Sequence, residues 1–246
     1  MDLIRYLVKC FTHLVFGNSA IIIGFLFGYP NAAKYIAKAY NLRKISKQEL
    51  QHLAMFTNNA NPAFILITVG LIMFENLKVG IILLISHILS SVILGIIFRP
   101  KSIIQQDLKN ENSNCFKKQS LFNNIVASIL DTFKTLAIIF SFTVIFNILS
   151  TFMCTLSSNN IYKLIVTGIF EISNGLNITA ASAMSLNAKI LISSLILGFS
   201  SLMIMFQVYS SFLSCPIKLR CIFVAKVLQG VISCRNYISI NEMGIL

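Results

Sequence analysis

An apolar run from Leu53 to Phe74 constrains this chain more than any other segment, because it is long enough to cross a bilayer. Its middle, however, contains the segment FTNNANP at residues 56–62, with Thr57, three asparagines and Pro62. Lipid offers such polar groups no hydrogen-bonding partner, so they must face protein, water or a ligand. Proline lacks an N–H and disfavours helix at the preceding residue, which predicts an unwound backbone with free carbonyls and half-helix ends. We interpret this break as half of a solute site in a transporter-like membrane protein.

The composition of the whole chain is that of an all-α polytopic membrane protein. Of its 246 residues, 56% are hydrophobic and 11% are charged, and the mean hydropathy is +0.80, which excludes an ordinary soluble domain. The net charge of +12 comes from Lys and Arg in short segments between apolar runs, so we interpret it as a signal of topology. No nucleic-acid motif accompanies these residues, and we expect the lipid bilayer rather than nucleic acid as the partner.

Sequence signatures of enzymes and metal sites are absent. The six cysteines contain no CxxC pair, and the three histidines lack metal-ligand spacing. No Ser/His/Asp, HExxH, P-loop or GxGxxG pattern occurs. We therefore expect no enzymatic activity, no metal and no cofactor, and the sequence leaves open whether a coupling ion is H⁺ or Na⁺.

A short helical hairpin is predicted near the N-terminus, after an apolar helix over residues 1–16. Apolar residues 20–27 precede the turn Gly28–Asn31, and a helical pattern covers residues 32–40. Each arm, at ~1.5 Å per residue, spans only about half of the ~30 Å hydrocarbon core, which favours a re-entrant hairpin with its tip near the midplane. A single span over residues 11–27 followed by a surface helix fits the composition equally well.

The remainder of the first half, which covers residues 1–98, is predicted as the broken helix and a span. Ser46 and Glu49 have the spacing of a capping box, which predicts where the broken helix starts. The span covers residues 79–98. A polar loop at residues 99–120 then carries five cationic residues if Arg99 is included, so we expect this loop to face the cytoplasm.

The second half, residues 121–246, has the same layout as the first. A span that ends near residue 156 precedes a short hairpin with the polar turn Glu171–Asn177, a helix interrupted at Gly198–Ser201, and a C-terminal helix. Each hairpin tip precedes its helix break by about 30 residues, and the loop assignment brings the first hairpin in from the cytoplasm and the second from outside. Such an inverted repeat of re-entrant hairpins and discontinuous transmembrane helices is typical of secondary transporters.

Charged residues mark two further features of the second half. Asp131 and Lys134 are three residues apart at the start of a span, so they are able to pair on one helix face. Lys226 lies near the middle of the last helix, residues 217–233. That helix therefore either spans the membrane or lies in the interface.

Several of these segments together resemble a known family. The segments GYPNAAK (residues 28–34), FTNNANP (residues 56–62) and EISNG (residues 171–175), with residues 198–220, are similar to the YlbJ-type sporulation integral membrane proteins. Members of that family carry a nucleoside-recognition (Gate) domain similar to the core of concentrative nucleoside transporters. They have further transmembrane sequence before the first hairpin, so this chain looks like an N-terminally short form.

The second broken helix departs from the family pattern. Relatives tend to have Gly-Gly and His-Ala-Gln where this chain has Ser200-Ser201 and Met205-Phe206-Gln207. The close approach of backbone that the glycines allow, and the protonation of the histidine, are therefore not expected in the second half of this chain. The first half carries the pattern more completely.

The predicted substrate-binding residues come from both hairpin tips and both breaks. Asparagine amides can donate to a carboxylate or accept from a solute hydroxyl, although they can equally bond freed backbone. Lys34 either offers charge to an anionic solute or extends to the cytoplasmic headgroups. Glu171 is a carboxylate deep in an apolar stretch, which marks a functional site by default. The full set is Gly28, Tyr29, Pro30, Asn31, Lys34, Thr57, Asn58, Asn59, Asn61, Glu171, Asn174, Asn177, Ser200, Ser201 and Gln207.

The resemblance implies an integral membrane carrier that moves a small polar or anionic solute during spore formation. A dipicolinate-type solute moving toward the forespore is the expected cargo, with the protein in the cell membrane and, during sporulation, in the outer forespore membrane. The alternatives are a non-transporting sporulation scaffold and a nucleoside transporter-like protein. A homo-oligomer is compatible with each of these.

Overall fold

The structure is a computed structural model that describes residues 15–100 and 121–242. Within these ranges every regular element is helical and no strand occurs. The helix expected over residues 1–16 and the loop expected over residues 99–120 lie almost wholly outside them. The elements, in chain order, are α2 (Val15–Leu26), α3 (Asn31–Asn41), α4 (Lys47–Phe56), η1 (Phe64–Met73), α5 (Leu77–Ile97), α6 (Leu121–Thr155), α7 (Asn160–Phe170), α8 (Ile172–Ala181), α9 (Leu186–Phe199), α10 (Ser201–Ser210) and α11 (Leu219–Glu242).

Four helical stretches of the described chain are long and apolar enough to cross a membrane: Leu77–Ile97, Leu121–Thr155, Leu186–Ser210 and Leu219–Glu242. The protein is a polytopic helical membrane protein, and the fold class predicted from the composition is confirmed. The last stretch is α11, with 24 residues. Its length and composition favour a span over an interfacial helix.

The first hairpin consists of α2 and α3, which pack against each other around the turn at residues 27–30. α3 has 11 residues, so at ~1.5 Å per residue it covers about half of the hydrocarbon core. It buries a stripe of mostly small side chains, which are Ala32, Ala33, Ile36, Ala37 and Ala39. A helix on the membrane surface would leave this stripe without a protein partner, so the structure favours the hairpin over the surface helix.

The first broken helix begins and breaks where the sequence predicted. Glu49 N donates to Ser46 Oγ at 3.2 Å, and Ser46 N donates to Glu49 Oε2 at 2.7 Å, which completes the capping box. α4 ends at Phe56, and helix resumes at Pro62 before it continues into η1. Proline suits the first position of a helix, because the N–H that it lacks has no partner there. η1 is a π-helix, a form that is rare and often found at functional sites.

Glycines allow the long helices to approach each other closely. A Cβ on Gly70 of η1 would lie 2.7 Å from the Cα of Gly80 in α5. A Cβ on Gly198 of α9 would lie 2.6 Å from the Cα of Gly230 in α11. Small residues at helix contacts are the usual means of close packing in membranes, where lipid provides no hydrophobic drive between helices.

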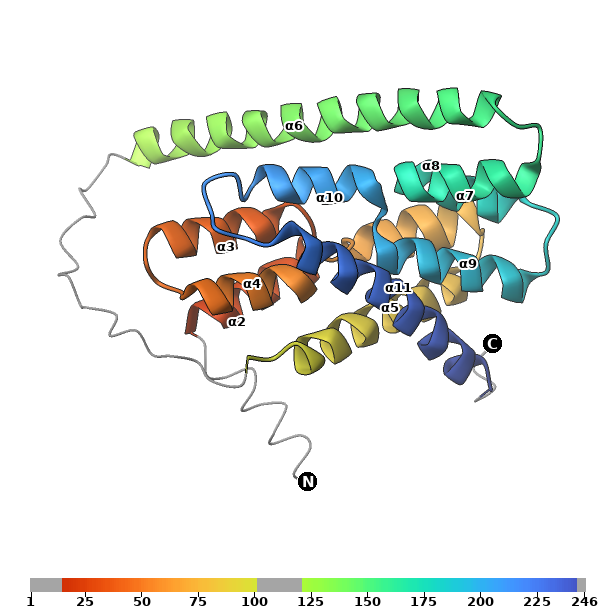
Figure 1. Ribbon diagram of the computed structural model, residues 1–246, viewed down its shortest axis with the longest axis horizontal. Coiled ribbons are helices and arrows are strands. Elements are labelled where there is room, and N and C mark those ends of the chain that lie inside the picture. The colour runs from red at the N-terminus through yellow and green to blue at the C-terminus, as the bar shows by residue number, and fades with distance from the viewer. Residues whose placement is uncertain (1–14, 101–120, 243–246) are drawn as a thin grey trace.

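α6 is one continuous helix of 35 residues that runs along one edge of the molecule (Figure 1). Most of its side chains are exposed. Asp131 of this helix pairs with Lys34 of α3, with 3.0 Å between Nζ and Oδ2. Asp131 thus pairs with Lys34 and not with Lys134, the partner that its spacing allows. The reason is tertiary, because α3 brings an ammonium group to Asp131 and residue spacing within α6 cannot reveal this.

The two hairpins lie toward opposite ends of the molecule (Figure 1). Figure 1 shows α3 and α4 toward one end of the molecule and the α7–α8 hairpin toward the other. Each hairpin is followed by a broken helix, which is α4–η1 in the first half and α9–α10 in the second, and then by a span, α5 or α11. This order of elements is the one that the spacing predicted.

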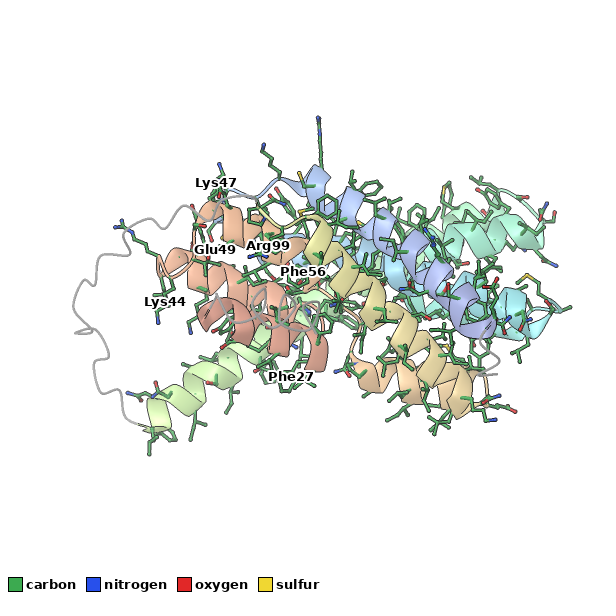
Figure 2. The ribbon with its side chains drawn as sticks, turned by 90° about the horizontal axis from the view of Figure 1, so that it is seen from below. Phe27, Lys44, Lys47, Glu49, Phe56 and Arg99 are labelled. Atoms are coloured by element: carbon green, nitrogen blue, oxygen red, sulfur yellow. The ribbon has the colours of Figure 1, made fainter. Side chains whose placement is uncertain are left out.

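Basic residues gather at one end of the molecule. Figure 2 shows Lys44 and Lys47 toward one end of the molecule, with Arg99 between them and Phe56. Loops rich in Lys and Arg face the cytoplasm in most membrane proteins, so we expect this end to be cytoplasmic.

This orientation predicts a labelling pattern. In a cysteine-free background, single cysteines at Lys47 and Lys218 should react with a membrane-impermeant maleimide only in inside-out vesicles. Cysteines at Lys78 and Ser158 should react only in intact cells or right-side-out vesicles. Labelling of all four positions from one side would contradict the opposed arrangement of the two halves.

Candidate functional site

The break between α4 and η1 is buried, and its side chains turn back onto α4. Thr57 Oγ1 donates to Leu53 O at 2.8 Å, Asn58 Nδ2 to Ala54 O at 2.8 Å, and Asn59 Nδ2 to Phe56 O at 2.9 Å. The Asn58 and Asn59 amides thereby satisfy carbonyls that the end of the helix leaves free, whereas Leu53 O also accepts from Thr57 N at 3.0 Å. The amide N–H groups thus have a structural role, but Asn58 Oδ1 is buried and has no hydrogen-bond partner among the described residues.

The tip of the first hairpin lies directly against this break. Tyr29 N donates to Asn59 O at 2.9 Å, and Asn61 Nδ2 donates to Phe27 O at 3.4 Å. Gly28 has φ of +69°, and a Cβ there would lie 2.8 Å from Asn61 N. Only glycine fits this position, because a side chain would both strain the backbone and collide with the break. The tip and the break predicted from sequence are therefore brought together.

A buried lysine from the second half reaches the same break. Lys226 of α11 is 2% exposed, and its ammonium donates to the main-chain carbonyl of Asn58 and, at 2.8 Å, to Gln229 Oε1. Gln229 Nε2 donates in turn to Asn59 Oδ1 at 3.0 Å. α11 thus satisfies two oxygens of the break, one from the backbone and one from a side chain.

α5 closes the other side of the break through His87 and Ser91. Ala60 N donates to His87 Nε2 at 3.2 Å, so this nitrogen carries no hydrogen and the neutral ring holds its hydrogen on Nδ1. His87 Nδ1 is buried without a hydrogen-bond partner in the described part of the chain. Ser91 Oγ accepts from Asn59 Nδ2 at 2.9 Å. The break is therefore surrounded by α5, α11 and the first hairpin.

The second hairpin tip is built around Glu171, which is 3% exposed. Its carboxylate caps α8, since Oε1 accepts from Ser173 N at 2.9 Å and Oε2 accepts from Asn174 N at 2.6 Å. This is a favourable N-cap arrangement, with a negative charge at the positive end of a helix. The Asn174 side chain donates to Asn147 Oδ1 of α6 at 3.2 Å, and Asn177 is exposed on α8.

The second break has an unusual backbone. Ser200 and Ser201 have φ of +67° and +55°, in the left-handed region that favours glycine. Ser200 Oγ donates to Leu197 O at 3.1 Å, whereas Ser201 Oγ is buried without a hydrogen-bond partner among the residues described. Gln207 lies further along α10, where its amide donates to Ile139 O of α6 at 3.5 Å.

The two hairpin tips lie near each other. Tyr29 is within electrostatic range of the Glu171 carboxylate, and α8 packs against η1. Groups from the two halves therefore meet in the interior, where the hairpins and the first break come together. Pro30 follows Tyr29 through a cis peptide bond, and Asn31 opens α3 with an exposed side chain.

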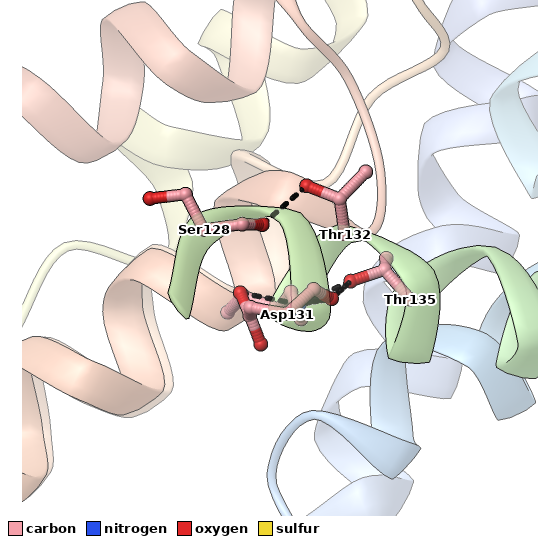
Figure 3. Close-up of polar contacts among 5 residues, drawn as sticks. Ser128, Asp131, Thr132 and Thr135 are labelled. Atoms are coloured by element: carbon pink, nitrogen blue, oxygen red, sulfur yellow. Dashed lines mark hydrogen bonds and ion pairs between the residues drawn. The ribbon is translucent and has the colours of Figure 1, made fainter. Parts of the chain in front are cut away.

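Lys34 lies away from this junction, on the side of α3 that faces α6. Besides its ion pair with Asp131, its ammonium donates to Thr135 Oγ1. Figure 3 shows the surrounding turns of α6, where Thr135 Oγ1 donates to Asp131 O at 2.7 Å and Thr132 Oγ1 donates to Ser128 O at 2.8 Å. The contacts of Lys34 are thus those of a group that docks α3 onto α6.

Sequence reasoning missed Lys226, Gln229, His87 and Ser91 as members of the site. The signal for Lys226 was present, because a cation in the middle of an apolar helix needs a buried partner. It was interpreted instead as a reason to doubt that the helix spans. The other three carry no such signal, since only the packing of α5 and α11 against the break brings them there.

Comparison with known proteins finds a distant relative. No family model matches the chain. The chain is similar to the sporulation integral membrane protein YlbJ of Bacillus subtilis (strain 168). The two are 25% identical over 250 residues, which cover 87% of this chain and 61% of YlbJ. The chain thus spans less than two thirds of the length of this relative. No solved structure matches.

The left-handed serines predict a stabilising substitution. Ser201→Gly should raise the free energy of unfolding by about 1 kcal/mol, because it relieves left-handed strain and removes a buried hydroxyl that has no partner. Ser201→Ala is the control, since it removes the hydroxyl but keeps the strained Cβ. Thermal unfolding of the purified protein in detergent measures both. A melting temperature that rises with alanine as much as with glycine would show that the strain is unimportant.

The contacts of Lys34 predict a double-mutant result. Lys34→Ala and Asp131→Ala should each destabilise the protein slightly, since an exposed ion pair contributes at most about 1 kcal/mol. The double variant should be no less stable than either single variant. If Lys34 instead bound solute, Lys34→Ala would impair transport while Asp131→Ala left it intact.

Proposed function

We propose that this protein is a membrane carrier for a small polar or anionic solute. The observation that supports the proposal is the junction of two opposed half-length hairpins with a helix break that contains buried, partly unsatisfied polar groups. Transporters with inverted repeats bind solute where discontinuous helices meet, and alternate access by moving one repeat against the other. The four long apolar helices supply the surrounding span.

The ends of the half-helices favour an anionic solute. α3 starts at the tip of the first hairpin, and its N-cap residue Pro30 makes no side-chain hydrogen bond to it. The positive end of α3 is therefore uncapped in the interior, whereas Glu171 already caps α8. Half-helix N-termini of this kind point at anionic substrate groups in transporters. Lys226 adds a positive charge at the adjoining break.

The relative suggests the biological setting. YlbJ is named a sporulation integral membrane protein, and we propose that this chain also acts in spore formation, in the cell membrane and the outer forespore membrane. A dicarboxylate such as dipicolinate fits the charge of the junction. The predicted nucleoside-recognition (Gate) domain makes a nucleoside the second solute to test. The proposal includes no enzymatic step.

Transport assays on purified protein in proteoliposomes test the function. We expect uptake of radiolabelled dipicolinate above that of protein-free liposomes, and less uptake of radiolabelled uridine. Asn58→Ala should reduce dipicolinate uptake at least about tenfold, because a buried polar group that is left without its partner costs about 1–3 kcal/mol. Asn123→Ala, an exposed asparagine on α6 outside the predicted substrate-binding set, is the matched control and should transport normally.

Glu171 needs a pair of variants, because its carboxylate also caps α8. Glu171→Asp preserves the charge and a good N-cap, whereas Glu171→Gln removes the charge and keeps one acceptor. Loss of transport in Glu171→Gln with normal transport in Glu171→Asp would show that transport requires the negative charge of Glu171. Absence of dipicolinate and uridine transport by the unaltered protein would overturn the proposal and favour the scaffold alternative.

A further inference from the structure

The buried ammonium of Lys226 has an unusual set of partners. Its hydrogen bonds go to the Asn58 carbonyl and to Gln229 Oε1, both of them neutral oxygens. No carboxylate pairs with it among the described residues. A charge without a counter-charge in a membrane interior costs free energy. Such a residue therefore indicates a functional role rather than a stabilising one.

The oxygens around this ammonium resemble the ligands of an alkali cation. The Asn58 carbonyl is freed by the helix break, Asn58 Oδ1 beside it has no partner among the described residues, and Gln229 supplies an amide oxygen. Hard cations bind carbonyl and amide oxygens of this kind, and unwound helix segments coordinate the coupling ions of transporters. The ammonium group occupies the position that a bound cation would take.

We propose that the ammonium of Lys226 is the resident cation of the broken helix, that is, it takes the place of a diffusible metal ion among the oxygens of the break. Its protonation and deprotonation then couple transport to protons. This inference rests on the proposed function, which it extends by naming the coupling ion. While protonated, Lys226 holds the break to α11 through the Asn58 carbonyl. When the ammonium gives one proton to water on one side, the neutral amine loses its charge attraction for that carbonyl. Reprotonation from water on the other side completes the cycle.

The charges near Lys226 are few. α11 packs against α4, α5 and α9. From α5, the neutral ring of His87 faces Lys226. The ionisable residues of α4 (Lys47, Glu49 and His52) lie in its first turns, and Lys189 of α9 bonds to Ala180 O at the other end of the molecule. On α11 itself, Arg220 and Arg235 are exposed. The positive charge at the break is therefore that of Lys226.

Removing the lysine should create a metal site, which is a test independent of transport. Lys226→Ala leaves the oxygens without their ammonium, so Na⁺ should bind there. Sodium chloride at about ten times the dissociation constant should raise the melting temperature of Lys226→Ala by about 3–6 °C over equal choline chloride. The unaltered protein and Lys218→Ala, a lysine exposed at the cytoplasmic end, should show no such difference. A sodium response in the unaltered protein, or none in a folded Lys226→Ala, would overturn the proposal.

Coupling is tested with Lys226→Arg, which keeps a positive charge that does not release its proton. In proteoliposomes of the unaltered protein, a gradient of about one pH unit should change dipicolinate accumulation by up to about tenfold. Lys226→Arg should show no change with the gradient, and Lys218→Arg should respond as the unaltered protein does. An unchanged gradient response in Lys226→Arg would refute proton coupling through Lys226. If the unaltered protein moved no dipicolinate, the proposed function would fail, and the sodium test would still decide whether Lys226 is a resident cation.

Discussion

The structure depends on one constraint, which is that backbone groups freed inside a membrane must find partners within the protein. The break after Phe56 frees several carbonyls at once. The side chains of Asn58 and Asn59 satisfy some of them, Lys226 of α11 satisfies the Asn58 carbonyl, and Ser91 of α5 gives the Phe56 carbonyl a second donor. The same bonds hold these helices around the break, so the local defect in α4–η1 organises the packing of the surrounding elements.

The architecture could be predicted from sequence because its signals are local. Pro62 and the asparagines locate the break, Ser46 and Glu49 locate the start of α4, and the length of each apolar run limits which segments cross. The partners of the site were not predictable, because they depend on which helix faces which. Asp131 illustrates this. Its spacing from Lys134 allows an ion pair within α6, but in the fold Asp131 pairs with Lys34 of α3. Gln229 reaches Asn59 across 170 positions of sequence in the same way.

The two halves share a plan but differ in chemistry. The first tip offers an uncapped helix end and a glycine pressed against the break, whereas the second tip fills its own helix end with Glu171. At the second break, serines occupy backbone positions that suit glycine. The first break is therefore the richer in polar contacts between the halves, and the second is the more strained. The same order of elements is thus held by different contacts in the two halves.

The length of α6 has a consequence for how the protein sits in its membrane. Its 35 residues extend about 52 Å, which exceeds a hydrocarbon core of about 30 Å. Hydrophobic mismatch of this size is relieved by tilt or by projecting one end into the headgroups. Because α6 exposes most of its surface and contacts α3 through Lys34 and Asp131, a change in tilt would be passed to the first hairpin. Bilayer thickness would then act on the half of the molecule that carries the break.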